Sequence, residues 1–165
     1  MGLSVGIITY NEEKNILKVI KSVEKIADEI IIVDSNSTDN TVDLAKKNGA
    51  QVFIENWKGY GPQKNSVIEK CNHDWILLID ADEVVSEKLR KRIFKIINNK
   101  PEFEVYKINF TAVCFGKTIK YGGWSNHYRI RLFRRGSGLY NDREVHEKFV
   151  TKSLVGKIKE DLYHY

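Results

Sequence analysis

Apolar and polar residues alternate in blocks along the first hundred positions of the chain. Short runs rich in Ile, Val and Leu predict buried strands at residues 3–9, 29–34, 51–55 and 75–80. Segments with apolar residues at helical spacing follow them and predict helices at residues 12–26, 39–48, 63–71 and 87–99. Asn11 stands where it would cap the first helix, and Gly49 where it would stop the second. Strands that alternate with helices indicate an α/β fold with a mostly parallel sheet covered on both faces.

The pattern changes after Pro101. Aromatic and β-branched runs without helical periodicity occupy residues 103–110, 113–120 and 128–135, and glycine-containing turns separate them. We expect these runs to be antiparallel strands. The chain is therefore expected to form one domain over residues 1–165, with an α/β half at residues 1–100 and a β-rich half at residues 101–165.

Length and composition agree with one globular domain, because 165 residues with 42% hydrophobic content suffice for a two-sided core. The apolar runs are far shorter than the ~20 residues that a membrane-spanning helix needs, and no secretory signal pattern opens the chain. These features predict a cytoplasmic protein. Cys71 and Cys114 are not closely spaced and match no metal pattern, so reduced thiols are expected.

Charge is divided unevenly along the chain. Residues 117–159 carry eleven Lys and Arg and three acids, whereas the rest carries sixteen bases and nineteen acids, for a net charge of +5. A basic final part indicates an anionic partner, such as phosphates, an acidic membrane surface or nucleic acid. Solvated surface side chains would produce the same count, so the charge alone leaves the partner open.

Two carboxylates, Asp80 and Asp82, follow the predicted strand at residues 75–80. They stand on a strand's side-chain period, and ligands of open α/β sheets collect at the carboxyl ends of the strands. Such a pair suits a divalent cation that carries a diphosphate. An acidic loop that caps the next helix would contain the same residues, so the pair alone does not decide.

Polar residues also end two other predicted strands. The first strand leads into Thr9, Tyr10, Asn11 and Glu12, and the second ends in Asp34 and Ser35. Three polar strand ends at one sheet edge predict a pocket, in which Asp34 accepts from a nucleobase, Tyr10 stacks and Asp82 holds a cation. Capping or turn roles remain an alternative for each residue by itself.

Residues 8–16, 33–41 and 79–83 together resemble the inverting, metal-dependent glycosyltransferases of family 2, which have the GT-A fold. Residues 57–65 and 145–147 resemble the branch that contains lipopolysaccharide core β-1,4-glucosyltransferases. The resemblance implies transfer of a hexose, glucose in that branch, from a UDP-linked or other nucleoside-diphosphate sugar. The acceptor would be a saccharide or lipid-linked saccharide, such as a lipopolysaccharide core or another cell-envelope glycan.

The resemblance also implies roles for individual residues. Glu147 is implied as the catalytic base that takes the acceptor's proton, with Asp142 as its rival. Asp82, Asp80 and His164 are implied as ligands of Mg²⁺ or Mn²⁺. The implied nucleotide-sugar-binding residues are Thr9, Tyr10, Asn11, Glu12, Asp34, Ser35, Lys64, Asp80, Ala81 and Asp82.

The run at residues 128–135 alternates Arg with apolar residues through Leu132, which predicts one basic strand face. With Lys117, Lys120 and Arg143, this face is expected to contact an anionic acceptor or the cytoplasmic face of the inner membrane. Nucleic acid is not expected, because no RNA-binding or helix-turn-helix signature is present. Other candidates for contact with sugars or phosphates are Trp57, Tyr60, Trp124 and His146, for which packing or structural roles are open alternatives.

Two other functions compete with the transferase. A sugar-1-phosphate nucleotidyltransferase shares the nucleotide-binding sheet, but it needs a glycine-rich loop after the first strand, and residues 9–13 contain no glycine. A non-catalytic module that binds nucleotide or an anionic surface is the second alternative. Metal-dependent binding of UDP distinguishes the transferase from such a module.

Overall fold

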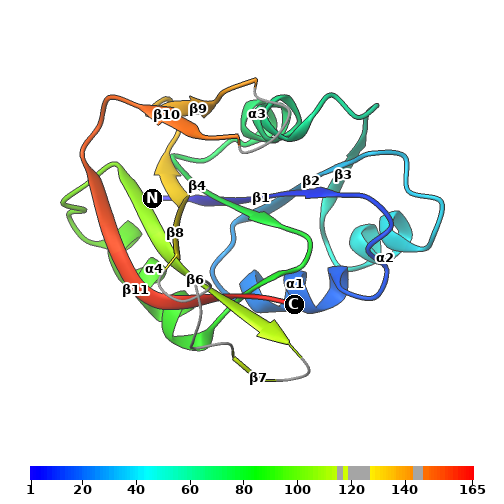
Figure 1. Cartoon of the computed structure of the whole chain (residues 1–165), viewed down its shortest axis with the longest axis horizontal. Helices are drawn as coiled ribbons and strands as arrows, with labels where there is room; N and C mark the ends of the chain where they lie inside the picture. The colour runs from blue at the N-terminus through cyan, green and yellow to red at the C-terminus, as the bar shows by residue number, and fades with distance from the viewer. Residues whose placement is uncertain (115–116, 119–126, 143–146) are drawn as a thin grey trace.

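A single mixed sheet runs through the molecule (Figure 1). The computed structural model describes residues 1–114, 117–118, 127–142 and 147–165. In these residues the sheet has the strand order β3-β2-β1-β4-β8-β6-β11-β5, with β7 paired to β6, and a separate two-stranded sheet contains β9 and β10. The strands are β1 Leu3–Thr9, β2 Glu29–Asp34, β3 Gln51–Ile54, β4 Trp75–Asp80, β5 Glu83–Val85, β6 Val105–Cys114, β7 Lys117–Thr118, β8 His127–Arg134, β9 Gly138–Tyr140, β10 Phe149–Thr151 and β11 Val155–His164.

The first half has the predicted alternation of strands and helices. Its helices are α1 Ile16–Val23, α2 Thr41–Lys47, α3 Tyr60–Lys70 and α4 Glu87–Asn98. Strand β1 pairs in parallel with β2 and with β4, and β2 pairs in parallel with β3. The sheet then continues from β4 into β8 without a break, so strands from both predicted halves share one sheet.

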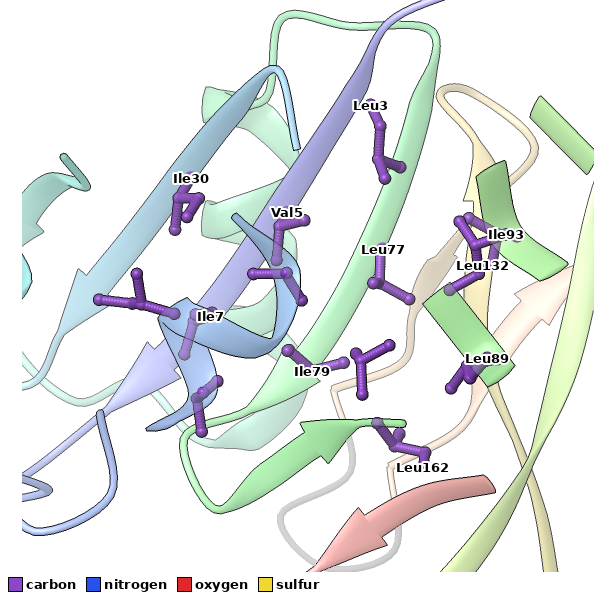
Figure 2. Packing of buried hydrophobic residues seen from close by; sticks show 14 of the residues in the cluster. Leu3, Val5, Ile7, Ile30, Leu77, Ile79, Leu89, Ile93, Leu132 and Leu162 are labelled. Carbon is purple, nitrogen blue, oxygen red and sulfur yellow. The ribbon is translucent and has the colours of Figure 1, made fainter. Parts of the chain in front are cut away.

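The side-chain period of the strands divides the core into two clusters. On one face, Leu3, Val5 and Ile7 of β1 join Leu77 and Ile79 of β4, and helices α1 and α4 cover them (Figure 2). On the other face, the intervening residues of the strands pack under α3 and strand β9. Figure 1 shows α3 on the opposite side of the sheet from α1, α2 and α4. The sheet is thus covered on both faces, as the sequence predicts.

Helix α3 packs against β1 at Gly6. A Cβ atom on Gly6 would lie 2.4 Å from Cγ1 of Val67 and 2.9 Å from Cδ1 of Leu78. Only glycine fits there without a shift of the neighbouring side chains. This contact holds α3, which begins at Tyr60 rather than at residue 63, against the strands that carry the polar ends.

Two further details, at the start of α1, differ from the prediction. Helix α1 begins at Ile16 rather than at residue 12, because the carbonyl of Glu12 accepts the N–H groups of Asn15 and Ile16 in a preceding turn. Asn11 is not a helix cap: it has a φ of 52°, and its Oδ1 accepts the Thr38 N–H at 2.8 Å. The predicted helix stop at Gly49 is confirmed, with a φ of 83°.

The second half is only partly antiparallel. Strands β6 and β8 are antiparallel as predicted, but β11 runs parallel to β6 and was not predicted. Its exposed lysines alternate with buried residues such as Ile158 and Leu162, which makes the strand look polar in sequence. The run at residues 113–120 is not one strand, because Val113 at the end of β6 pairs with Thr118 of β7. Residues 119–120 lie outside the described residues, as do Trp124, Arg143 and His146.

Two smaller observations complete the fold. Cys71 is buried in the cluster under α3, and burial raises the pKa of its thiol to about 12. This agrees with a reduced, unreactive thiol. In the described part of the chain, every helix is too short or too polar to span a bilayer.

Candidate active site

A cleft of about 800 Å³ opens at the carboxyl ends of β1, β2 and β4. The parallel register explains its position, because Thr9 pairs with Asp34 and Ile8 pairs with Asp80. The three strands therefore end at the same sheet edge, where open α/β sheets bind ligands. The lining residues are Ile8, Thr9, Tyr10, Glu12, Ser35, Trp57, Tyr60, Asp80, Ala81, Asp82 and His164.

One wall of the cleft is aromatic. The rings of Trp57 and Tyr60 meet edge to face with centroids 4.8 Å apart, and both side chains are 50% exposed. Tyr10 is also exposed. The hydroxyl of Thr9, in the same lining, is buried and has no partner among the described atoms. A ligand with a flat ring and hydrogen-bonding groups matches this lining.

Asp80 marks the point where β4 enters the cleft, and two cations hold its carboxylate. Arg131 donates to Oδ2 at 2.7 Å, and Nζ of Lys64 lies 3.3 Å from Oδ1. Burial alone raises the pKa of Asp80, but the charges of Arg131 and Lys64 outweigh it and hold this pKa below its ordinary value. Asp80 is therefore an ionised carboxylate that faces the protein's own cations as well as the cleft.

Glu83 holds the turn that carries Asp82. Its side chain is fully buried; Oε2 accepts the backbone N–H of Asp80 at 3.0 Å, and Oε1 accepts from Arg131 at 2.5 Å. Burial raises the pKa of Glu83, whereas the charges of Asp80 and Glu83 keep the pKa of buried Arg131 well above its ordinary value. Hydrogen bonds to Arg131 and between Asp80 and Glu83 thus fix both ends of the segment from Asp80 to Glu83.

The structure corrects the predicted basic face of β8. Arg129 is exposed, but Arg131 is only 2% exposed, because it faces the two buried carboxylates of Asp80 and Glu83. The sequence showed an arginine in an apolar strand and acids near residue 80, but not their contact. Arg129 also stands between apolar residues and is exposed, so no local sequence signal distinguishes the buried Arg131.

Asp82 and His164 meet at the other end of the cleft. Nε2 of His164 lies 3.1 Å from Oδ2 of Asp82, and both side chains are partly exposed. The hydrogen bond to Asp82 raises the pKa of His164, and partial burial opposes this effect. Strand β11 brings the histidine here, because His164 pairs with Glu83 of β5. The predicted association of these two residues across 82 positions of sequence is present in the structure.

Lys64 and Glu147 lie behind the cleft rather than in its lining. Lys64 is 2% exposed and donates to Oε1 of Glu147 at 2.6 Å. Since the same ammonium lies 3.3 Å from Asp80, the two carboxylates are linked through one buried cation. Glu147 lines a second cavity of about 430 Å³. Asp142, the rival candidate for the base, is exposed and lines neither cavity.

Asp34 and Asn11 are also outside the lining. Asp34 is fully buried and accepts both from the Ser37 backbone N–H at 2.8 Å and from the Ser37 hydroxyl at 2.5 Å. Asn11, through Thr38, ties the loop after β1 to the loop after β2. In this arrangement both residues shape the loops that border the cleft, and their predicted contact with a nucleotide stays a prediction.

In the described residues, no group of three or more His, Cys, Asp or Glu side chains gathers in a way that would hold a metal ion alone. A cation here would need ligand oxygens from a bound molecule or water in addition to Asp82 and His164. This requirement fits a cation that arrives with a diphosphate.

Comparison with known proteins assigns the family. Residues 4–158 match the family described as Glycosyl transferase family 2. The chain belongs to this family. The predicted resemblance and the GT-A-like α/β fold are therefore confirmed.

Relatives and a solved structure support the assignment. This family 2 member is 44% identical over 116 residues to an uncharacterized glycosyltransferase of Rickettsia typhi, covering 69% of this chain and 40% of that protein. It is 33% identical to the lipopolysaccharide core biosynthesis glycosyltransferase LpsC of Rhizobium meliloti, covering 99% and 63%. The crystal structure of S. aureus TarS in complex with UDP-GlcNAc is similar with a TM-score of 0.60 and 26% identity, covering 72% and 37%.

Proposed function

We propose that this family 2 chain transfers a hexose, glucose in the first instance, from a UDP-linked sugar to a saccharide acceptor with inversion at the anomeric carbon. The single observation that carries the proposal is the cleft at the ends of β1, β2 and β4, into which Asp82 projects beside an aromatic wall. The similarity to TarS, which was crystallised with UDP-GlcNAc, supports a uridine donor. The relative LpsC supports a lipopolysaccharide core or a related cell-envelope glycan as acceptor.

Asp82 and His164 fit a divalent cation, Mg²⁺ or Mn²⁺. Asp82 supplies a partly exposed carboxylate, and His164 supplies an imidazole nitrogen 3.1 Å from it. Arg131 donates to Oδ2 of Asp80, whereas Oδ1 lies 3.3 Å from Nζ of Lys64 and has no hydrogen-bond partner among the described atoms. We therefore assign the cation to Asp82 and His164 with Oδ1 of Asp80 as a further ligand oxygen, and Oδ2 of Asp80 stays bound to Arg131. When bound, the cation stabilises the departing diphosphate as a Lewis acid.

The protein's own groups account for donor placement. Trp57 and Tyr60, both half exposed, offer ring faces in the cleft lining. Thr9 presents an unpartnered hydroxyl, and Tyr10, Glu12 and Ser35 border the same end. These residues are suited to hold the nucleoside and to fix the anomeric carbon near Asp82.

Glu147 is suited to accept the proton of the attacking hydroxyl. Its carboxylate is 17% exposed, contacts Lys64 and lines the second cavity. Because Lys64 contacts both carboxylates, the separation of their oxygens cannot exceed the sum of the two contact distances, 2.6 and 3.3 Å. The short separation from Asp80 supports our proposal that Glu147 is the base.

The site of action follows from the chemistry. A nucleotide-sugar donor implies a cytoplasmic reaction, and a lipid-linked acceptor would bring the protein to the cytoplasmic face of the inner membrane as a peripheral protein. We expect no nucleic-acid partner.

A donor screen tests the proposal. UDP- and GDP-linked hexoses are added with Mn²⁺, Mg²⁺ or EDTA, and thermal stabilisation and slow release of the free nucleoside diphosphate are followed. We expect metal-dependent stabilisation by a UDP-sugar in the parent and its loss in Asp82→Ala. Asp43→Ala, which removes an exposed acid of α2, is the matched control and should behave as the parent.

Two outcomes would contradict the proposal. Absence of metal-dependent binding for every donor would exclude the transferase site. Binding without any release of nucleoside diphosphate, even with acceptor glycans present, would favour the non-catalytic binding module.

A further inference from the structure

The two-stranded sheet of β9 and β10 has one face on the core and one face in solvent. On the inner face, the rings of Tyr140 and Phe149 meet edge to face with centroids 5.3 Å apart, and Phe149 packs on Phe133 of β8. Leu139 and Val150 are opposite positions of the antiparallel ladder, so their side chains share the outer face. They are 52% and 59% exposed, which leaves an apolar pair open to solvent.

Exposure alternates from the start of β10 to the residues that follow it. Within residues 148–154, partly buried residues stand between exposed ones. The partly buried residues are tied to the protein, because the Thr151 hydroxyl donates to the Ser137 carbonyl at 2.6 Å and the Ser153 hydroxyl donates to Glu104 at 3.1 Å. The exposed residues of this segment are Lys148, Val150, Lys152 and Leu154.

The outer face is here defined as these four exposed residues together with Leu139. At 80%, Leu154 is the most exposed large hydrophobic residue in the described chain. Along the segment, lysines therefore alternate with aliphatic side chains, and both kinds are open to solvent. An apolar group so exposed has little reason to be retained unless something covers it.

The charge of the outer face is free of internal partners. Among the residues that the structure describes, neither Lys148 nor Lys152 forms an ion pair with a carboxylate. Residues 134–157 carry six bases and three acids, and one of these acids, Glu147, is bound to Lys64. The surroundings of the outer face are thus positive and complementary to an anionic partner.

The chemistry of the outer face favours a lipid surface over other anionic partners. Aliphatic side chains enter the acyl boundary of a bilayer, while lysines reach the headgroups and lay their stems along apolar surface. Single-stranded nucleic acid is bound by aromatic rings that stack on bases, and the outer face contains none. Face-to-face packing of two copies would bring the lysines of both together, with no acid among the outer-face residues to separate them.

We propose that the outer face of β9 and β10 docks on an anionic lipid bilayer. Leu139, Val150 and Leu154 enter the acyl boundary, and Lys148 and Lys152 contact lipid phosphates. A surface of this size gives reversible, peripheral binding. Delivery of the chain to a lipid-linked acceptor by this contact rests on the proposed function, whereas the binding of lipid does not.

Vesicle flotation of the whole chain tests the proposal. We expect binding to vesicles of phosphatidylcholine with about one third phosphatidylglycerol to be at least about ten-fold stronger than to phosphatidylcholine alone, and to weaken at high salt. The variants Val150→Ser/Leu154→Ser and Lys148→Gln/Lys152→Gln should each weaken binding to the anionic vesicles by at least about ten-fold.

Matched controls lie on α4. Phe94→Ser removes an exposed apolar side chain, and Lys88→Gln/Lys95→Gln removes two exposed charges, so both should float as the parent does. UDP with Mn²⁺ should bind every variant as it binds the parent, which shows that each is folded. Vesicle binding without any UDP binding in the parent would sink the proposed function and leave the docking surface standing.

Four results would overturn the docking surface. The first two are equal binding to both kinds of vesicle and unchanged binding in both outer-face variants. The third is a dimer in sedimentation that is lost in Val150→Ser/Leu154→Ser, without vesicle binding in the parent. The fourth is a preference for a single-stranded oligonucleotide over the anionic vesicles that is lost in Lys148→Gln/Lys152→Gln.

Discussion

The parallel strands β1, β2 and β4 and the mixed strands β6, β8 and β11 contribute different things to the site. The parallel strands deliver polar residues at their carboxyl ends, from short segments that follow each strand directly. The mixed strands deliver single side chains, Arg131 from β8 and His164 from β11, and Glu147 stands just before β10 of the two-stranded sheet. The first region presents polar groups to the cleft, and the second holds Asp80 and Glu83 in place and contains the proposed base, Glu147.

The difference shows how the cleft is stabilised. Asp80 and Glu83 would be costly buried acids without Arg131, which lies about fifty positions later in the chain. The cleft therefore depends on a strand from the other half of the sheet. Variants in each region should separate binding of the donor, transfer and folding.

The largest expected effect concerns transfer. Glu147→Gln removes the proposed base but keeps the size of the side chain, so transfer should fall by about 10²- to 10⁴-fold. Binding of UDP with Mn²⁺ should stay within about two-fold, because Glu147 lies outside the donor cleft. Single-turnover transfer and calorimetry measure the two quantities, and Asp142→Asn is the control. Undiminished transfer in Glu147→Gln would assign the base elsewhere.

The next effect concerns folding. Arg131→Met leaves Asp80 and Glu83 without their shared counter-ion and should lower the free energy of unfolding by about 3–5 kcal/mol. Urea unfolding at pH 7 measures this change. Arg129→Met at the exposed neighbouring position should change stability by less than about 0.5 kcal/mol. Adding Glu83→Gln to Arg131→Met should recover part of the lost free energy of unfolding. Strictly additive effects of the two changes would contradict the proposed coupling of Arg131 and Glu83.

The sequence predicted the residues at the ends of the parallel strands β1, β2 and β4 better than the residues of β8 and β11 that contact them. Residues 75–80 form the expected strand, and Asp82 and His164 lie 3.1 Å apart, while their role as metal ligands stays a prediction. The partners of Asp80 and Lys64 were not predictable, because ion pairs between α3, β4 and β8 depend on tertiary packing that no local pattern encodes. The strand β5 was too short, and β11 too polar, for their periodicity to be recognised.

A smaller effect on stability is expected where α3 packs on β1. Gly6→Ala places a Cβ atom 2.4 Å from Val67 and should lower the free energy of unfolding by about 1–3 kcal/mol through overpacking. In the Gly6→Ala/Val67→Ala variant the clash is relieved, so the two changes should not add. Thermal unfolding of the two single variants and the double variant measures this coupling, and strict additivity would show that α3 does not contact β1 this closely.

The smallest effect is a pH dependence at the end of β3. Hydrogen bonds from Lys58, Lys70 and Ser66 lower the pKa of Glu55 to about 2. Its stabilisation is present above the ordinary pKa of 4.5 and is lost as the pH falls toward 2. Glu55→Gln should cost about 1 kcal/mol at pH 7, allowing for solvent screening, and progressively less below pH 4.5.

Unfolding curves of the parent and Glu55→Gln across this pH range test that expectation. Glu69→Gln, at an exposed position of α3, is the control. A difference between Glu55→Gln and the parent that stays constant from pH 7 to pH 2.5 would contradict the assignment.

Calorimetric titration of UDP, with Mn²⁺ and with EDTA, tests the central claim most directly. The account predicts saturable binding with Mn²⁺ in the parent, much weaker binding with EDTA, and no metal dependence in Asp82→Asn. Binding of UDP to Asp82→Asn that is still strengthened by Mn²⁺ as much as in the parent would contradict the assignment of the cation and its nucleotide to this cleft.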